Sequence, residues 1–260
     1  MERKSGRIVV LGAGNVGWHL APALAGAGEV VQIWSRSIEN ARALAERIPG
    51  AEATDRLESI ERSADLYIIA VKDDVIEAVA KTLKGVKGIV AHTSGSFSLE
   101  QLQSALPDNS VGVFYPFQTF SKNSPVDFST VPFFIEGNCE ATTQTLSQLA
   151  KNLSEDVREA DSSIRQKLHI AAVFACNFTN FLWDLADTYL KENSDMDIKI
   201  MQPLLSEMYR KAMILGPHAS QTGPAVRNDK NIIEKHLSQL DPEKAEIYRF
   251  ITDQIIKYHK

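Results

Sequence analysis

The sequence predicts an α/β protein in which a doubly wound parallel sheet is followed by an all-helical domain. In the first half of the 260 residues, short and almost continuously apolar runs alternate with amphipathic stretches, which is typical of buried parallel strands joined by helices. After about residue 155 no strand-like run recurs, and long helical patterns take over. We therefore expect two domains, residues 1–157 and 158–260.

The sheet is expected from six short apolar runs, at residues 8–11, 30–34, 66–71, 88–92, 111–115 and 132–136. Helices are expected at residues 18–27, 38–48 and 74–83, each of which connects two successive runs among the first four. Right-handed crossovers between parallel strands then give the doubly wound arrangement.

The second domain is expected to contain four helices, at residues 162–191, 199–215, 229–240 and 241–260. The first of them is apolar on almost all sides from residue 170 to 190, so it is buried or lies in an interface. A domain of about 100 residues cannot easily cover so much apolar surface, and we expect a two-fold homodimer built through the helical domains.

The composition excludes several classes of protein. A hydrophobic share of 44% with 23% charged residues supplies an ordinary core, and the net charge of −5 disfavours nucleic acid and anionic membranes as partners. The apolar run near the N-terminus is too short for a signal peptide or a membrane span, so we expect a soluble cytoplasmic protein. The two cysteines give neither a disulfide framework nor a zinc cluster, and we expect no metal site.

A glycine-rich turn follows the first strand, with the sequence Gly12-Ala13-Gly14-Asn15-Val16-Gly17. In this spacing Gly12 permits a tight turn, Gly14 lets a diphosphate approach the backbone, and Gly17 lets helix and strand pack closely. The free amides at the start of the helix would bind the diphosphate. The alternative is a glycine-rich turn without a ligand, but the strand–turn–helix context favours dinucleotide binding.

The end of the second strand indicates which dinucleotide binds. An NAD site usually carries an acidic residue there, whereas this chain has Ser35-Arg36-Ser37, which suits a 2′-phosphate and favours NADP over NAD. The alternative is an exposed arginine beside a serine helix cap. The backbone of Val71 and Lys72, at the end of the third strand, is expected to line the nicotinamide ribose.

Polar residues at the end of the fourth strand are candidates for substrate contacts. His92, Ser94 and Ser96 can hydrogen-bond a polar substrate or relay a proton. The alternative is a polar strand-to-helix turn whose serines cap the helix.

The long helix carries a polar stripe. At about 100° per residue, one narrow face contains His169, Asn177, Asn180 and Asp184. Either these residues form an internal hydrogen-bond network, or they face the interdomain cleft. In the second case His169 would act as general acid or base, and Asn177 would orient a substrate carbonyl.

A loop broken by glycine and proline, residues 222–227, ends in Arg227. Its guanidinium could clamp a carboxylate or phosphate of the substrate, the alternative being an interdomain or surface salt bridge.

These motifs together resemble a known group. Residues 10–17, 34–37 and 70–74 are similar to the cofactor domain of the 6-phosphogluconate dehydrogenase and pyrroline-5-carboxylate reductase superfamily. Residues 92–96, 115–120 and 222–227 resemble a bacterial family that joins a Rossmann-like domain to a helical domain of unknown function. The resemblance implies a helical second domain like the superfamily's dimerisation domain, in proteins provisionally labelled oxidoreductases without an agreed substrate.

The chain departs from the resemblance at two places. The superfamily's catalytic Lys and Asn lie four residues apart on the long helix, but Lys167 is followed at that spacing by Ala171, so His169 and Asn177 would have to serve instead. The family's loop often reads Arg-Gly-Asp where this chain has Arg227-Asn228-Asp229.

Two functions remain open from the sequence. One is an NADP-dependent oxidoreductase that transfers a hydride between nicotinamide and a small polar, carboxylated substrate in the interdomain cleft. The other is a non-catalytic NADP-binding sensor or interaction protein on the same scaffold, which the missing Lys–Asn pair favours.

Overall fold

The computed structural model describes residues 5–259. By compactness the chain divides into two units, Met1–Phe174 and Ala175–Lys260, which are described separately below. The domain boundary predicted between residues 157 and 158 stays a prediction, because a division by compactness does not test where a folding domain ends.

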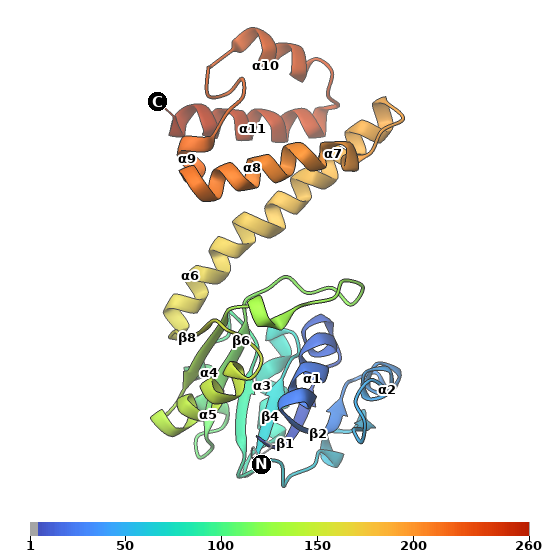
Figure 1. Ribbon diagram of the computed structural model, residues 1–260, viewed down its shortest axis with the longest axis vertical. Coiled ribbons are helices and arrows are strands. Elements are labelled where there is room, and N and C mark those ends of the chain that lie inside the picture. The colour runs from blue at the N-terminus through green and yellow to red at the C-terminus, as the bar shows by residue number, and fades with distance from the viewer. Residues whose placement is uncertain (1–4, 260) are drawn as a thin grey trace. The chain divides into compact units, whose positions relative to one another are not determined.

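The first unit contains an eight-stranded sheet (Figure 1) with the strand order β3-β2-β1-β4-β5-β6-β7-β8. The strands are β1 (Ser5–Leu11), β2 (Gly28–Trp34), β3 (Glu52–Thr54), β4 (Leu66–Ile69), β5 (Ile89–His92), β6 (Val111–Pro116), β7 (Phe133–Gly137) and β8 (Val157–Glu159). All neighbouring pairs are parallel except β6 with β7. The predicted fold class, an α/β protein with a doubly wound sheet, is confirmed.

Helices cover both faces of this sheet because the strands are apolar on both sides. On one face of the sheet, Ile8 and Val10 of β1 belong to an apolar cluster that includes residues of α1 (Asn15–Ala27), α2 (Ile38–Ala45) and α5 (Glu140–Lys151). On the other face, Val9 and Leu11 belong to a second cluster, which includes residues of α3 (Asp73–Thr82) and α4 (Leu99–Ala105). Each face therefore has its own apolar core, and the strands' carboxyl ends are free to build a site.

The sequence prediction missed the short strands β3 and β8 and the antiparallel direction of β7. β8 follows residue 155, where no further strand was expected, because its three residues Val157–Glu159 include two charged ones and carry no apolar signal. β7 runs antiparallel to β6 because the connecting residues 117–132 hold only the short helix η2 (Phe128–Thr130) and bring the chain back from the same edge.

The second unit is helical. Its helices are α7 (Thr179–Asn193), η4 (Ile198–Met201), α8 (Gln202–Leu215), α9 (Pro217–Ser220), α10 (Lys230–Leu237) and α11 (Pro242–Tyr258). α6 (Ser162–Ala172) belongs to the first unit, and the backbone between α6 and α7, Val173–Phe178, is π-helical. No helix among residues 5–259 is both long and apolar enough to cross a membrane.

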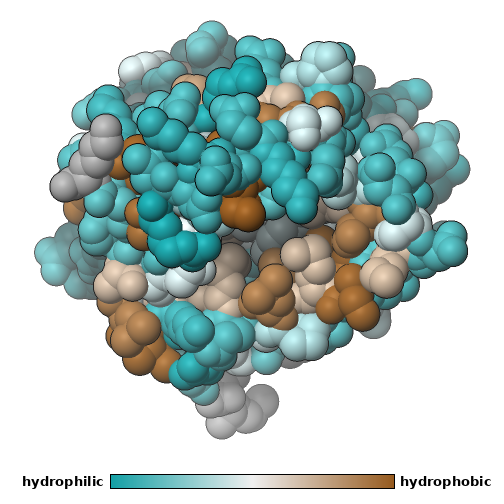
Figure 2. All heavy atoms as spheres, turned by 90° about the horizontal axis from the view of Figure 1, so that it is seen from above, coloured by the Kyte–Doolittle hydropathy of each residue, from teal (hydrophilic) through white to brown (hydrophobic). Residues whose placement is uncertain are grey.

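The second unit has almost no core of its own. Of residues 175–259 only Ala225, Ile233 and Thr252 are buried. The sequence predicted that the long helix is buried or lies in an interface. Within one chain α7 contains no buried residue, and its place in an interface stays a prediction. Figure 2 shows hydrophobic side chains at the surface among hydrophilic ones on the face that it displays. Large exposed apolar residues of this unit include Phe181, Trp183, Ile200, Leu204, Met208 and Met213.

Candidate functional site

The three glycines of the turn between β1 and α1 each occupy a position with a different steric demand. Gly12 has φ +131°, and a Cβ there would lie 2.2 Å from the carbonyl oxygen of Ala70. A Cβ on Gly17 would lie 1.9 Å from the carbonyl oxygen of Gly12, so helix and strand pack too closely for any side chain. A Cβ on Gly14 would meet nothing within 4 Å. The backbone at Gly14 is thus open to a ligand, as a bound diphosphate requires.

A cavity of about 550 Å³ lies over this turn. It is lined by all the cofactor-binding residues predicted from the sequence except Gly17, namely Gly12, Gly14, Asn15, Val16, Ser35, Arg36, Ser37, Val71 and Lys72. Its fifteen lining residues include three cations and no carboxylate, although the protein as a whole is acidic. The lining residues therefore fit an anionic dinucleotide.

The residues after β2 include a positive charge that suits a 2′-phosphate, and a serine that caps the next helix. Arg36 is exposed and forms no ion pair with a carboxylate within residues 5–259. The hydroxyl oxygen of Ser37 caps α2 by accepting a hydrogen bond from the Asn40 amide, and the hydroxyl donates to Glu39 at 2.8 Å. The predicted helix cap is present, and it leaves Arg36 free to bind an anion.

A second group of polar side chains gathers at the carboxyl ends of β5 and β6. The phenol oxygen of Tyr115 on β6 lies 3.4 Å from Nδ1 of His169 on α6. The ring of Tyr115 also packs so closely on the backbone at Gly95 that a Cβ there would lie 2.7 Å from it. Burial raises the pKa of Tyr115 to about 12, with the nearby carboxylate of Asp73 acting in the same direction. Tyr115 therefore stays protonated at neutral pH.

Arg165 fixes α6 on this edge of the sheet. Its side chain is fully buried, forms an ion pair with the carboxylate of Glu136, and donates to the carbonyl oxygen of Phe97 at 3.1 Å. Ser162, at the start of the same helix, donates to Glu136 at 3.0 Å. Because His169 follows Arg165 by four residues, it lies one turn along the same helical face. The buried ion pair thus positions His169 beside Tyr115.

The other residues predicted on the turn after β5 lie mostly inside the protein. His92 is fully buried, and its Nδ1 accepts a hydrogen bond from the Ser94 amide. Burial, together with the positive charge of Arg165, lowers the pKa of His92 to about 3, so the imidazole is neutral. The Ser94 oxygen accepts hydrogen bonds from the Ser96 and Phe97 amides. Ser94 thus closes the turn, whereas α4 is capped by Ser98 and not by Ser94 or Ser96. Of His92, Ser94 and Ser96, only Ser96 is exposed.

The polar stripe was predicted for a regular α-helix, and the observed backbone is not a regular α-helix over its whole length. The 100° spacing assumed an α-helix throughout, but Val173–Phe178 is π-helical, which changes the rotation per residue. His169 is half-buried, whereas Asn177, Asn180 and Asp184 are exposed. The structure groups His169 with Tyr115, and the role predicted for Asn177 stays a prediction.

Arg227 lies in the loop before α10. It is exposed and forms no ion pair among the described residues. Asn228 adopts the left-handed conformation, with φ 50°, that the family's glycine would favour. The turn therefore forms despite the substitution, and Asp229 caps α10 by accepting from the Ile232 amide.

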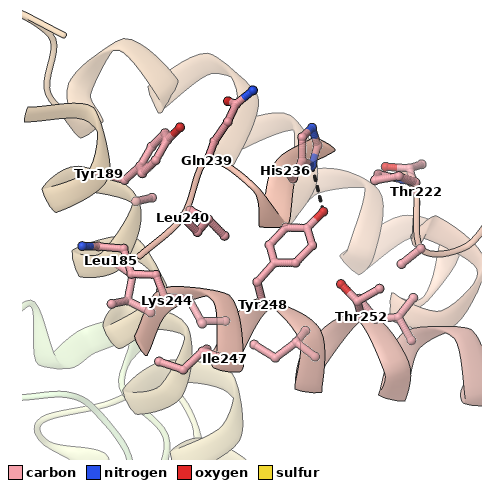
Figure 3. Close-up of a pocket in the computed structure, with 16 residues that line it drawn as sticks. Leu185, Tyr189, Thr222, His236, Gln239, Leu240, Lys244, Ile247, Tyr248 and Thr252 are labelled. Carbon is pink, nitrogen blue, oxygen red and sulfur yellow. Dashed lines mark hydrogen bonds between the residues drawn. The ribbon is translucent and has the colours of Figure 1, made fainter. Parts of the chain in front are cut away.

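A second cavity, of about 600 Å³, lies within the helical unit between α7, α10 and α11. Figure 3 shows its mainly apolar walls, with Tyr248 hydrogen-bonded to Nδ1 of His236 at 2.8 Å. Lys244 also lines it but forms ion pairs with Asp241 and Glu192. This cavity has no glycine-rich turn and no unpaired cation among its lining residues.

The fold and the turn define a dinucleotide-binding protein of the Rossmann type. Residues 7–92 match the family described as NADP oxidoreductase, coenzyme F420-dependent, and residues 131–255 match a domain of unknown function, DUF2520. The chain belongs to the family that joins these two parts. The family predicted from the sequence is thus confirmed, and so is the prediction that NADP is the cofactor.

Solved structures agree. A Bacteroides fragilis protein provisionally named an NADP oxidoreductase is 38% identical, with 98% of this chain and 99% of that chain covered and a TM-score of 0.91. An imine reductase from Myxococcus stipitatus in complex with NADP⁺ is 18% identical, with coverages of 96% and 92% and a TM-score of 0.64. The pyrroline carboxylate reductase of Plasmodium falciparum, with NADP bound, is 13% identical, with coverages of 99% and 99% and a TM-score of 0.60. These last two show a shared fold. No protein of curated function matches the chain.

Sequence reasoning missed three residues of these sites. Tyr115 entered the sequence analysis only within the family motif at residues 115–120, although a polar group at the carboxyl end of a strand is a usable signal. Arg165, near the start of α6, and Lys122, which lines the cofactor cavity from the connection between β6 and β7, could not be found, because local sequence does not show that these segments reach the sheet edge.

Proposed function

We propose that this protein is an NADP(H)-dependent oxidoreductase whose cofactor occupies the cavity over the glycine-rich turn. The amides at the start of α1 would bind the diphosphate, and Ser35, Arg36 and Ser37 would bind the 2′-phosphate. The observation that carries the proposal is a cavity lined by three cations and no carboxylate beside an open backbone at Gly14.

Calorimetric titration with NADPH and NADH tests cofactor binding. NADPH should bind more tightly than NADH, and Arg36→Ala should remove most of that difference. Equal affinities in the unaltered protein, or an unchanged affinity for NADPH in Arg36→Ala, would contradict the proposal.

We propose that the substrate is a small polar molecule with a carbonyl or imine carbon. The names of the imine reductase and the pyrroline carboxylate reductase that share the fold support this class. When bound, the cofactor supplies or accepts the hydride. In the direction of reduction, Tyr115 donates its phenolic proton to the substrate heteroatom, and His169 returns a proton to the phenol. Ser96, exposed on the neighbouring turn, hydrogen-bonds the substrate.

We further propose, from the sequence, that the substrate carries a carboxylate. Arg227 would bind this carboxylate, and Asn177 would orient the substrate carbonyl. A screen of carbonyl and imine compounds that follows NADPH absorbance tests the reaction. Turnover that disappears in His169→Ala supports the enzyme.

The second candidate is a non-catalytic NADP-binding sensor. The absence of the superfamily's lysine–asparagine pair, with Ala171 four residues after Lys167, favours it. NADPH binding without turnover of any compound in the screen would support this candidate.

We also propose that the protein is a homodimer through its helical unit. Three buried residues among residues 175–259 cannot stabilise six helices, and exposed apolar patches of this kind are typical of interfaces. Apolar side chains of a second copy would pack on α8 and fill the apolar cavity shown in Figure 3.

A further inference from the structure

Lys122 lines the cofactor cavity although it lies more than 80 residues from the glycine-rich turn and from Arg36 in sequence. We propose that its ammonium group binds the 2′-phosphate of NADP(H) together with Arg36. This inference rests on the proposed function, and it adds to the predicted site a specificity-determining residue from the connection between β6 and β7.

Side-chain contacts with α1 hold the loop that carries Lys122. Nε2 of His19, on α1, lies 2.8 Å from the carbonyl oxygen of Ser121. The imidazole also stacks on the ring of Phe120, with ring centroids 6.1 Å apart. Phe120 packs in turn on the buried ring of Phe128, at 6.0 Å. Lys122 follows these contacts directly, so its backbone is fixed beside the first turns of α1.

The side chain of Lys122 is positioned by an aromatic ring. Its Nζ lies 4.8 Å from the ring centroid of Trp18, on α1. Arg47 lies 4.5 Å from the same centroid and donates a hydrogen bond to the Trp18 carbonyl oxygen. Lys122 is half-buried and forms no ion pair with a carboxylate within residues 5–259. A cation that is positioned by a ring and lacks a carboxylate partner is available to a bound anion.

The location favours the 2′-phosphate over the diphosphate. The cavity reaches the start of α2, where Ser37 and Asn40 line it beside Arg36. Lys122 lines the same cavity as these three residues. A phosphate monoester carries almost two negative charges at neutral pH, which one arginine does not neutralise. Lys122 supplies the second positive charge, whereas NAD(H) has only an uncharged hydroxyl at that position.

Calorimetric titration of the full-length protein with NADPH and with NADH tests the proposal. In Lys122→Ala we expect the Kd of NADPH to rise about tenfold, as for the loss of one charge-assisted hydrogen bond, and the Kd of NADH to stay within about twofold. Lys122→Arg should restore most of the NADPH affinity because it keeps the charge. Thermal unfolding of each variant shows that the fold is retained.

Arg47→Ala is the matched control, because Arg47 contacts the same ring but does not line the cavity. It should leave the Kd of NADPH within about twofold of the unaltered protein. An equal loss in Arg47→Ala and Lys122→Ala would assign the effect to the packing of Trp18 and overturn the proposal. Equal weakening of NADPH and NADH in Lys122→Ala would place the ammonium at the diphosphate and also overturn it. If the unaltered protein bound neither nucleotide, the proposed function itself would fail.

Discussion

The phenol oxygen of Tyr115 and Nδ1 of His169 lie 3.4 Å apart, which brings the end of β6 together with a helix that begins after β8. Either group can donate, depending on the tautomer of the imidazole. Tyr115 packs on Gly95, which lies on the turn where a substrate was expected. Its pKa is also affected by Asp73, and Asp73 directly follows Lys72, a residue that lines the cofactor cavity. A proton donor and a group that can reprotonate it are thus present at the edge of the sheet where the nicotinamide is expected.

The first prediction concerns this pair. Tyr115→Phe should lower the turnover of any substrate found in the NADPH screen by about a hundredfold, because the ring remains but the proton donor is lost. The Kd of NADPH, measured by calorimetry, should stay unchanged, since Tyr115 does not line the cofactor cavity. Full turnover in Tyr115→Phe would remove the phenol from the mechanism and leave His169 as the donor.

The cofactor half of the site could be predicted from the sequence because its residues are local. Gly12, Gly14 and Arg36 follow directly from two strand ends, and spacing along the chain decides where they lie. The eight-stranded sheet was predicted for the same reason, apart from the short strands β3 and β8, which carry no apolar run.

The other half depends on tertiary contacts that spacing does not encode. Tyr115 and His169 are 54 residues apart, and they meet because Arg165 forms its buried ion pair with Glu136. The polar stripe was calculated at 100° per residue, which assumes an α-helix throughout. The π-helical segment between His169 and Asn180 changes this rotation, and the sequence does not indicate where such a segment forms.

The second prediction separates folding from cofactor binding at the glycine-rich turn. Gly12→Ala should lower the free energy of unfolding by about 2 kcal/mol or more, because φ +131° strains an alanine and its Cβ would meet the Ala70 carbonyl. Gly14→Ala should leave the unfolding free energy nearly unchanged, since its Cβ meets nothing within 4 Å, yet weaken NADPH binding. Urea unfolding and calorimetry on both variants measure this. NADPH affinity retained in Gly14→Ala would show that the cofactor does not approach there.

The third prediction is a pH dependence of stability caused by His92. Burial lowers the pKa of His92 from 6.5 to about 3, so below about pH 6.5 the unfolded chain binds a proton here that the folded protein does not. The stability from neutral His92 is fully present above about pH 6.5 and is lost as the pH falls towards 3. Its loss should lower the free energy of unfolding by about 1.4 kcal/mol between about pH 7.5 and pH 5.5.

Urea unfolding at those two pH values checks this on His92→Asn. The pH-dependent part should shrink in that variant, whereas His19→Asn, at a half-exposed position on α1, should keep it. The same pH dependence in His92→Asn as in the unaltered protein would assign the effect to other groups.

The last prediction concerns assembly. Leu204 and Met208 lie one turn apart on α8 and are 62% and 50% exposed, which water would disfavour unless a second chain covers them. Light scattering at micromolar concentration should give about twice the 28.8 kDa of one chain. The double variant Leu204→Glu/Met208→Glu should be monomeric and less stable, because two carboxylates cannot be buried unpaired in the interface.

Lys151→Glu, at an exposed position on α5 of the other unit, is the matched charge change and should stay dimeric. A mass near 28.8 kDa for the unaltered protein would refute the dimer, and a dimeric double variant would exclude this face of α8 from the interface.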